Sequence, residues 1–149
     1  MLMIYKINSD EDLKKHSLDR DKFVDFLYKH LDKFGDSKED INRCIDYSFS
    51  KAEGKGGFSV VAFDEDKFIG ALVMNKTGMG GYIPENVLVY VAVHPGERGK
   101  GFGRKIVEQA HEWVDGSVKL HVEYDNPAKR LYERIGYTNK YAEMRFLKK

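Results

Sequence analysis

A glycine-rich turn with several basic residues follows an apolar run in the second half of the chain. The run covers residues 87–93 and does not alternate, which is typical of a strand covered on both faces. Side-chain-free backbone and three cations then lead into a predicted helix, at Arg98, Gly99, Lys100, Gly101, Phe102, Gly103 and Arg104. Because the first N–H groups of a helix are unpaired and its dipole is positive there, this turn favours a phosphate or pyrophosphate.

Two classes of nucleotide-binding loop fit this turn poorly. A phosphate loop of the Gly-Lys-Ser/Thr type needs a hydroxyl residue after Lys100, where Gly101 stands. A dinucleotide fingerprint needs a third glycine where Arg104 stands, although Glu123 lies where a ribose-binding acid is expected. The remaining ligand is an acyl carrier, with its pyrophosphate on the turn and its amide arm along the preceding strand.

Apolar periodicity predicts the elements that position the turn. Helix faces are expected over residues 23–34 and from Ser37 to residue 49, and another helix after the turn with a stop at Gly116. Strands are expected over residues 3–7, 58–63, 68–74, 87–93 and 118–122, then a short helix over 127–136, and one or two final strands over 137–147. The helix between residues 93 and 118 makes its two flanking strands a parallel pair. The order predicts an α/β fold with a mixed sheet.

Composition narrows the class of protein. With 149 residues, of which 42% are hydrophobic, the chain suits one domain spanning residues 1–149. Its 25 basic and 24 acidic residues give a net charge of +1, so no overall field attracts a nucleic acid. The single cysteine, Cys44, is expected to be a buried hydrophobe, and no Cys/His spacing suggests a metal site. No signal or membrane segment is recognised, and a cytoplasmic location is expected.

Residues 87–137 resemble the GNAT acyltransferase superfamily. Its acetyl-coenzyme A motif reads Arg or Gln, two residues, Gly, one residue, then Gly or Ala, and here it is similar to Arg98, Gly101 and Gly103. A second stretch, NPAKRLYERIGY from Asn126, resembles the family's Asn, Ala, Leu-Tyr, Gly-Phe signature. Two departures occur: Asn126 lies two rather than three residues before the alanine, and a tyrosine ends the motif in place of phenylalanine.

The resemblance implies a fold and a reaction. The fold is a central mixed sheet of six to seven strands flanked by about four helices. The reaction is acyl transfer, most simply of acetyl, from acetyl-coenzyme A to a primary amine by direct attack, without a metal. The amides of Val91, Ala92 and Val93 would bind the pantetheine arm and the thioester oxygen, and the turn would bind the pyrophosphate.

The resemblance also suggests roles for side chains. Tyr132 would act as a general acid near the coenzyme sulfur, and Asn126 and Ala128 would help to bind the coenzyme. Histone-type members carry a glutamate on the central strand at the position of Val87. Glu85 lies two residues earlier and is the candidate general base, because alternate residues of a strand share a face.

No motif recognised in the sequence identifies the acceptor. A small-molecule amine, such as an aminoglycoside, polyamine or amino acid, and a protein lysine all stay open, as does a homodimer. The alternative to an enzyme is a non-catalytic acyl-coenzyme A sensor or a partner-binding module on the same fold. Release of coenzyme A thiol with an amine would distinguish the two.

Overall fold

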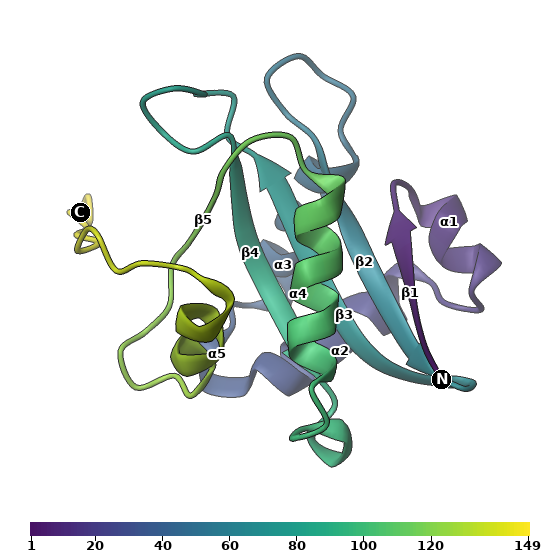
Figure 1. The fold of residues 1–149 in the computed structure, drawn as a ribbon. Helices are drawn as coiled ribbons and strands as arrows, with labels where there is room; N and C mark the ends of the chain where they lie inside the picture. The colour runs from purple at the N-terminus through teal and green to yellow at the C-terminus, as the bar shows by residue number, and fades with distance from the viewer.

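A computed structural model describes all residues, 1–149, and shows one five-stranded sheet with helices on both faces (Figure 1). The strands lie across the sheet in the order of the sequence: β1 (Leu2–Ile7), β2 (Gly57–Asp64), β3 (Lys67–Lys76), β4 (Asn86–Val93) and β5 (Val118–Leu120). The pairs from β1 to β4 are antiparallel, whereas β4 and β5 are parallel, as the helical connection between them predicts. The mixed α/β fold class is therefore confirmed.

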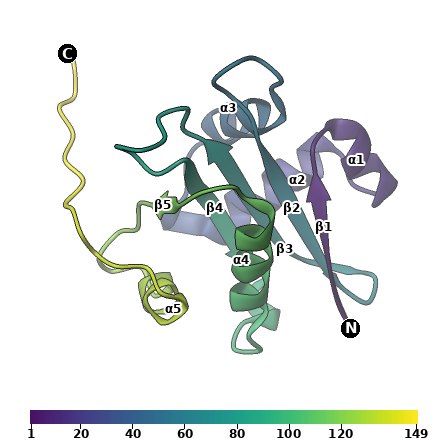
Figure 2. The ribbon, with the colours of Figure 1, turned by 45° about the horizontal axis from the view of Figure 1, so that its top comes forward.

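The helices cover the two faces of this sheet (Figures 1 and 2). On one face lie α1 (Asp10–Lys15), α2 (Arg20–Leu31) and α3 (Lys38–Phe49), and on the other α4 (Phe102–Trp113) and α5 (Ala128–Ile135). Two short 3-10 turns, η1 (Asp32–Phe34) and η2 (Pro95–Glu97), follow α2 and β4. Each face has its own apolar core, so β2, β3 and β4 are packed on both sides. None of the helices has both the length and the apolar character that crossing a membrane requires.

Local capping explains where the first helices begin. The side chains of Ser9 and Ser37 accept hydrogen bonds from backbone N–H groups three residues later, as their spacing predicts. Asp19 does the same at the start of α2. Each such cap satisfies one otherwise unpaired N–H group and stabilises its helix by about 1 kcal/mol.

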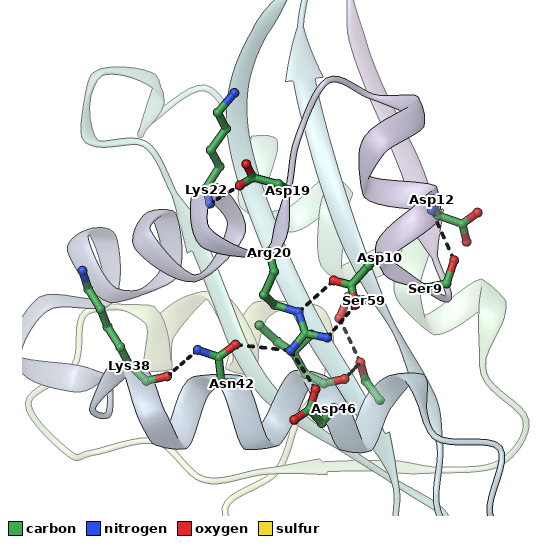
Figure 3. A network of polar contacts seen from close by, with 12 residues as sticks. Ser9, Asp10, Asp12, Asp19, Arg20, Lys22, Lys38, Asn42, Asp46 and Ser59 are labelled. Atoms are coloured by element: carbon green, nitrogen blue, oxygen red, sulfur yellow. Dashed lines mark hydrogen bonds and ion pairs between the residues drawn. The ribbon is translucent and has the colours of Figure 1, made fainter.

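The Arg20 guanidinium joins the three N-terminal helices (Figure 3). It donates two hydrogen bonds, of 2.9 and 3.0 Å, to the Asp10 carboxylate at the start of α1. It also donates to Asn42 at 3.2 Å and to Asp46 at 2.7 Å, both on α3. This side chain is only 23% exposed, so the network fixes the packing of α1, α2 and α3 over the sheet.

The end of the chain differs from the expectation. Residues 138–149 form neither helix nor strand and run away from the sheet beyond α5 (Figures 1 and 2). The predicted six to seven strands are therefore five, and the predicted four helices are five α-helices with two 3-10 turns. Tyr141, Met144 and Phe146 are 80%, 88% and 90% exposed, so they bury no apolar surface against the sheet. Local alternation suggests a strand, but only pairing with a partner stabilises one.

We predict that Arg20→Met lowers the free energy of unfolding by about 1–3 kcal/mol, because Asp10 and Asp46 lose their charged partner. Urea denaturation monitored by circular dichroism measures the change. Arg43→Met is the control, since the exposed Arg43 pairs only with nearby carboxylates on its own helix, and its loss should cost less than about 1 kcal/mol. Equal losses in the two variants would contradict a joining role for Arg20.

Candidate functional site

The unpaired edge of β4 is the centre of the candidate site. β5 pairs with β4 only at Asn86, Val87 and Leu88, so residues 89–93 have no strand partner on that side. On the opposite side β3 remains paired, with a register shift that leaves Val89 without a partner. Such a bulge bends a strand and increases its twist. β4 therefore bulges at Val89, and it pairs with its parallel neighbour only as far as Leu88.

Backbone groups of Val91 and Val93 face this open edge. The N–H of His94 donates to a carbonyl of β3 at 2.8 Å. Because the N–H groups of an antiparallel strand point alternately to its two edges, the N–H of Ala92 also faces β3, whereas those of Val91 and Val93 face away. The Val93 carbonyl follows this rule, since it accepts a 3.2 Å hydrogen bond from Arg98, which lies outside the sheet. Two of the three predicted arm-binding amides thus point to the open edge, and Ala92 belongs to the β3–β4 ladder.

The glycine turn continues directly from this edge into α4. Gly99 and Gly101 both have φ of +81°, a conformation that residues with a side chain rarely adopt. Gly101 precedes the first residue of α4, and no side chain caps this helix and no carboxylate lies in its first turn. The first N–H groups of α4, from Phe102 onward, are therefore available to an anion.

The three cations of the turn are engaged by other protein groups. Besides Val93, Arg98 donates at 3.2 Å to the carbonyl of His30 and so ties the end of α2 to the end of β4. Lys100 lies 2.7 Å from Glu97. Arg104 lies 3.2 Å from Glu108, one turn further along α4. Anion binding at the turn then depends mainly on backbone N–H groups, with the cations as secondary support.

Sequence reasoning did not identify Glu97. Its side chain is 11% exposed and accepts hydrogen bonds from Lys100 and Lys67, the latter at the start of β3. These two ammonium groups lower the pKa of the Glu97 carboxyl, with Lys100 as the larger cause. Glu97 thereby fastens the turn to the β2–β3 hairpin. No spacing rule links a glutamate in a turn to a lysine thirty residues earlier.

The second motif is placed beside the first. The Asn126 side chain accepts a 2.9 Å hydrogen bond from the N–H of Ala128, so these two predicted residues form the start of α5. A Cβ atom on Gly103 would lie 3.4 Å from Leu131, which shows how closely α5 packs against the first turn of α4. The neighbouring Tyr132 is 8% exposed. The structure therefore brings the glycine turn and the Tyr132 helix together.

Burial controls the ionisation of the two tyrosines of this motif. Burial raises the pKa of Tyr132 to about 12 and also raises the pKa of Tyr137. The Tyr137 hydroxyl lies 2.7 Å from Nε2 of His111 on α4 and its ring contacts that of Tyr132, with centroids 5.8 Å apart. Both phenols therefore hold their protons at neutral pH. A tyrosine in this state can donate a proton but does not act as a base.

Glu85 lies at the closed end of β4, away from the glycine turn. Its carboxylate accepts hydrogen bonds from the N–H of Ser117 at 2.7 Å and of Gly81 at 3.3 Å. These backbone donors lower its pKa, with Ser117 as the first cause. Glu85 therefore holds two loops at the start of β4, and it does not lie at the open edge. The role of Glu85 as general base stays a prediction, for a side chain that lies at the other end of β4 from the glycine turn.

Two other polar groups, Cys44 on α3 and Tyr90 on β4, belong to the core on the α2 and α3 face of the sheet. Burial raises the pKa of Cys44 to about 12, which agrees with the expected hydrophobe and disfavours a nucleophile. The hydroxyl of Tyr90 on β4 donates a 2.5 Å hydrogen bond to Asp36, which lies between η1 and α3. This contact joins residues 54 positions apart and was not predicted. The sequence hints at this contact only in that Tyr90 is the one residue with a hydroxyl group in the run of residues 87–93.

A protein-family model matches the part of the chain that contains the glycine turn and the stretch from Asn126. The model of the GNAT acetyltransferase domain matches residues 55–139, more than half of the chain. A comparison with curated protein sequences finds no match.

Solved structures share the fold at low sequence identity. An aminoglycoside N-acetyltransferase in complex with CoA has a TM-score of 0.70 at 14% identity, covering 99% of this chain and 95% of that one. An aminoglycoside 6'-N-acetyltransferase from Acinetobacter haemolyticus has a TM-score of 0.66 at 16% identity, covering 99% and 98%. A transcriptional regulator from Bacillus halodurans C-125 has a TM-score of 0.62 at 17% identity, covering 99% of both chains. These likenesses show the fold alone.

The buried His111 should make the stability of the folded chain depend on pH. Burial lowers the pKa of His111 below its ordinary value near 6.5, so the unfolded chain takes up this proton more readily than the folded one. The resulting stability is present above pH 6.5 and is lost as the pH falls below it. We predict that His111→Gln reduces the fall in the urea midpoint between pH 7.5 and 5.5. His121→Gln, at an exposed histidine, should keep the wild-type fall, and identical behaviour of the two variants would contradict the assignment.

Proposed function

The chain belongs to the GNAT acetyltransferase family, and from this premise we propose that it transfers an acetyl group from acetyl-coenzyme A to a primary amine. One observation supports the proposal above the others. The free amides of Val91 and Val93 lead, within one continuous segment, to the uncapped N-terminus of α4. A long donor with an amide arm and a pyrophosphate is complementary to such a segment.

The backbone of the turn would hold the pyrophosphate. The N–H groups from Gly101 onward, at the positive end of α4, supply the donors that a phosphate accepts. Arg98 would act mainly by fixing the shape of the turn through the carbonyls of Val93 and His30. Arg104 lies on the first turn of α4 and would add positive charge nearby.

The open edge would hold the reacting thioester. One of the N–H groups of Val91 and Val93 would donate to the thioester oxygen, which becomes negative when the amine attacks the carbonyl carbon. A fixed donor of this kind stabilises the developing charge, and its removal in other enzymes costs about 3–4 kcal/mol. The bulge at Val89 would set the direction of these donors.

Tyr132 would complete the reaction as general acid. When the carbon–sulfur bond breaks, the coenzyme leaves as a thiolate. The phenol, which keeps its proton because its pKa is about 12, would donate it to the sulfur and regain one from the nitrogen of the attacking amine. Because a thiol has an ordinary pKa near 8.5, the thiolate is already a fair leaving group. The contribution of Tyr132 should therefore be at the lower end of the range for general acids, about 10²-fold.

The acceptor must attack as a neutral amine. An alkyl ammonium has a pKa of about 10.4, so its deprotonation at pH 7 costs about 4.6 kcal/mol. The ammonium form that dominates in solution must therefore release one proton, to water or to a base, before its nitrogen attacks the thioester. A small-molecule amine is the favoured acceptor class, because one protein of the same fold is described as an aminoglycoside N-acetyltransferase.

We predict that Gly101→Asp abolishes the binding of acetyl-coenzyme A, as measured by isothermal titration calorimetry. A carboxylate at this position repels the pyrophosphate. A Cβ there meets no atom within 4 Å, but the φ of +81° strains any side chain, so a control of the same size is needed. Gly101→Asn is the matched control for size and backbone strain and should lose less than about tenfold in affinity. Wild-type affinity in the aspartate variant would reject the pyrophosphate assignment.

We predict that Tyr132→Phe lowers kcat by about 10²-fold and leaves the affinity for acetyl-coenzyme A nearly unchanged. Release of coenzyme A thiol with a panel of primary amines is the assay. Tyr28→Phe, at an exposed tyrosine on α2, should keep the wild-type kcat. Unchanged turnover in Tyr132→Phe would remove the general-acid role, and binding without thiol release from any amine would favour a sensor over an enzyme.

A further inference from the structure

The hydrogen bond between Tyr90 and Asp36 crosses one face of the sheet at the level of the open edge. Tyr90 is 6% exposed and its ring belongs to the core beneath α2 and α3. Its hydroxyl reaches the exposed Asp36 carboxylate and donates to Oδ2 at 2.5 Å. Tyr90 also lies directly before Val91, whose amide faces the open edge. The carboxylate is thus anchored to the part of β4 where the thioester would react.

Two other contacts place the segment around Asp36 next to the glycine turn and to the loop before α5. This segment, residues 32–37, connects α2 to α3. Lys33 lies 3.6 Å from Asp125, which belongs to the loop between β5 and α5. At the end of α2, the His30 carbonyl accepts from Arg98 in the glycine turn. The segment therefore lies between the two motifs of the site, on the α2 and α3 face.

The charges on the two faces differ. The glycine turn and Tyr132 belong to the α4 and α5 face, where an anionic donor would bind. Asp36 belongs to the opposite face, and its hydrogen-bond donor is a neutral hydroxyl, which leaves the carboxylate charge uncompensated by that contact. Arg145 of the C-terminal segment pairs with Glu143, and the charge of Asp36 also helps to raise the pKa of its guanidinium.

We propose that Asp36 binds the ammonium group of the acceptor and that Tyr90 is the positioning residue that holds this carboxylate at the open edge of β4. The inference rests on the proposed function, which it deepens by naming the carboxylate that would hold the protonated amine and the residue that positions this carboxylate. The acceptor would approach from the α2 and α3 face and the acyl donor from the α4 and α5 face. The two would meet where Val91 and Val93 have no strand partner.

A binding experiment tests this assignment without depending on turnover. The full-length protein, labelled with ¹⁵N, is titrated with n-butylammonium and separately with n-butanol, and backbone amide shifts are recorded. We expect saturable shifts at residues 35–38 with the ammonium only, and a dissociation constant at least tenfold higher in Asp36→Asn. Asp32→Asn is the matched control, because it removes the same charge from the same segment without touching β4. No shift at residues 35–38, or equal effects of the two variants, would overturn the proposal.

Kinetic measurements separate binding from positioning. With n-butylamine as acceptor, Asp36→Asn should raise KM about 10- to 100-fold, since a charged hydrogen bond is lost, while the affinity for acetyl-coenzyme A stays at the wild-type value. Tyr90→Phe keeps the buried ring and should raise KM about three- to tenfold with kcat nearly unchanged. Asp36→Glu should restore part of the affinity. A fall in kcat at constant KM in both variants would contradict an acceptor-binding role.

The two proposals fail in different ways. If acetyl-coenzyme A binds but no amine releases its thiol, the acetyltransferase activity is rejected, and the butylammonium titration still decides the role of Asp36. If thiol is released and Asp36→Asn behaves like Asp32→Asn, the activity stands and the Asp36 site is rejected.

Discussion

The short parallel pairing between β4 and β5 is the constraint on which the candidate site depends. Only Asn86, Val87 and Leu88 pair with β5, and side chains at this end reinforce the pairing. The Asn86 amide donates to the carbonyls of Asp115 and Ser117 at 2.8 and 3.2 Å, and Glu85 accepts from the Ser117 N–H. Beyond this fastened end nothing holds the strands together, and twist separates them. The open edge thus arises because β4 and β5 pair only at the start of β4.

An unpaired edge inside a sheet needs cover, because exposed N–H and C=O groups invite pairing with other chains. Here α4 and α5 lie beside it, and small residues allow their close approach. A Cβ on Gly70 would lie 2.5 Å from the terminal methyl of Ile106, so glycine at this position leaves room for the Ile106 side chain of α4 against β3. A Cβ on Gly103 would touch Leu131 at 3.4 Å, which places α5 against the start of α4. The same packing that protects the edge brings Tyr132 to it.

Local sequence patterns predicted the elements whose formation is decided locally. The cap at Ser37, the turn that follows residue 93 and the start of α5 at Asn126 each depend on neighbours within a few residues, and all are found where expected. The final strand over residues 137–147 was wrong, because a strand exists only with a partner and alternation does not name one. The contacts of Glu85 with Ser117 and Gly81 were not predicted for a related reason: the alternation of residues along a strand does not say which loops lie beside its first residue.

Contacts between distant segments could not be predicted, and they include two contacts of charged side chains near the site. Glu97 with Lys67, and Tyr90 with Asp36, join residues 30 and 54 positions apart. The first contact fixes the glycine turn to β3, and the second holds a carboxylate on the α2 and α3 face. The net charge of +1 says nothing of these positions, because composition sums charges without regard to where they lie. In the proposed reaction an anionic donor and a cationic acceptor would bind on opposite faces of the sheet and would meet at the open edge of β4.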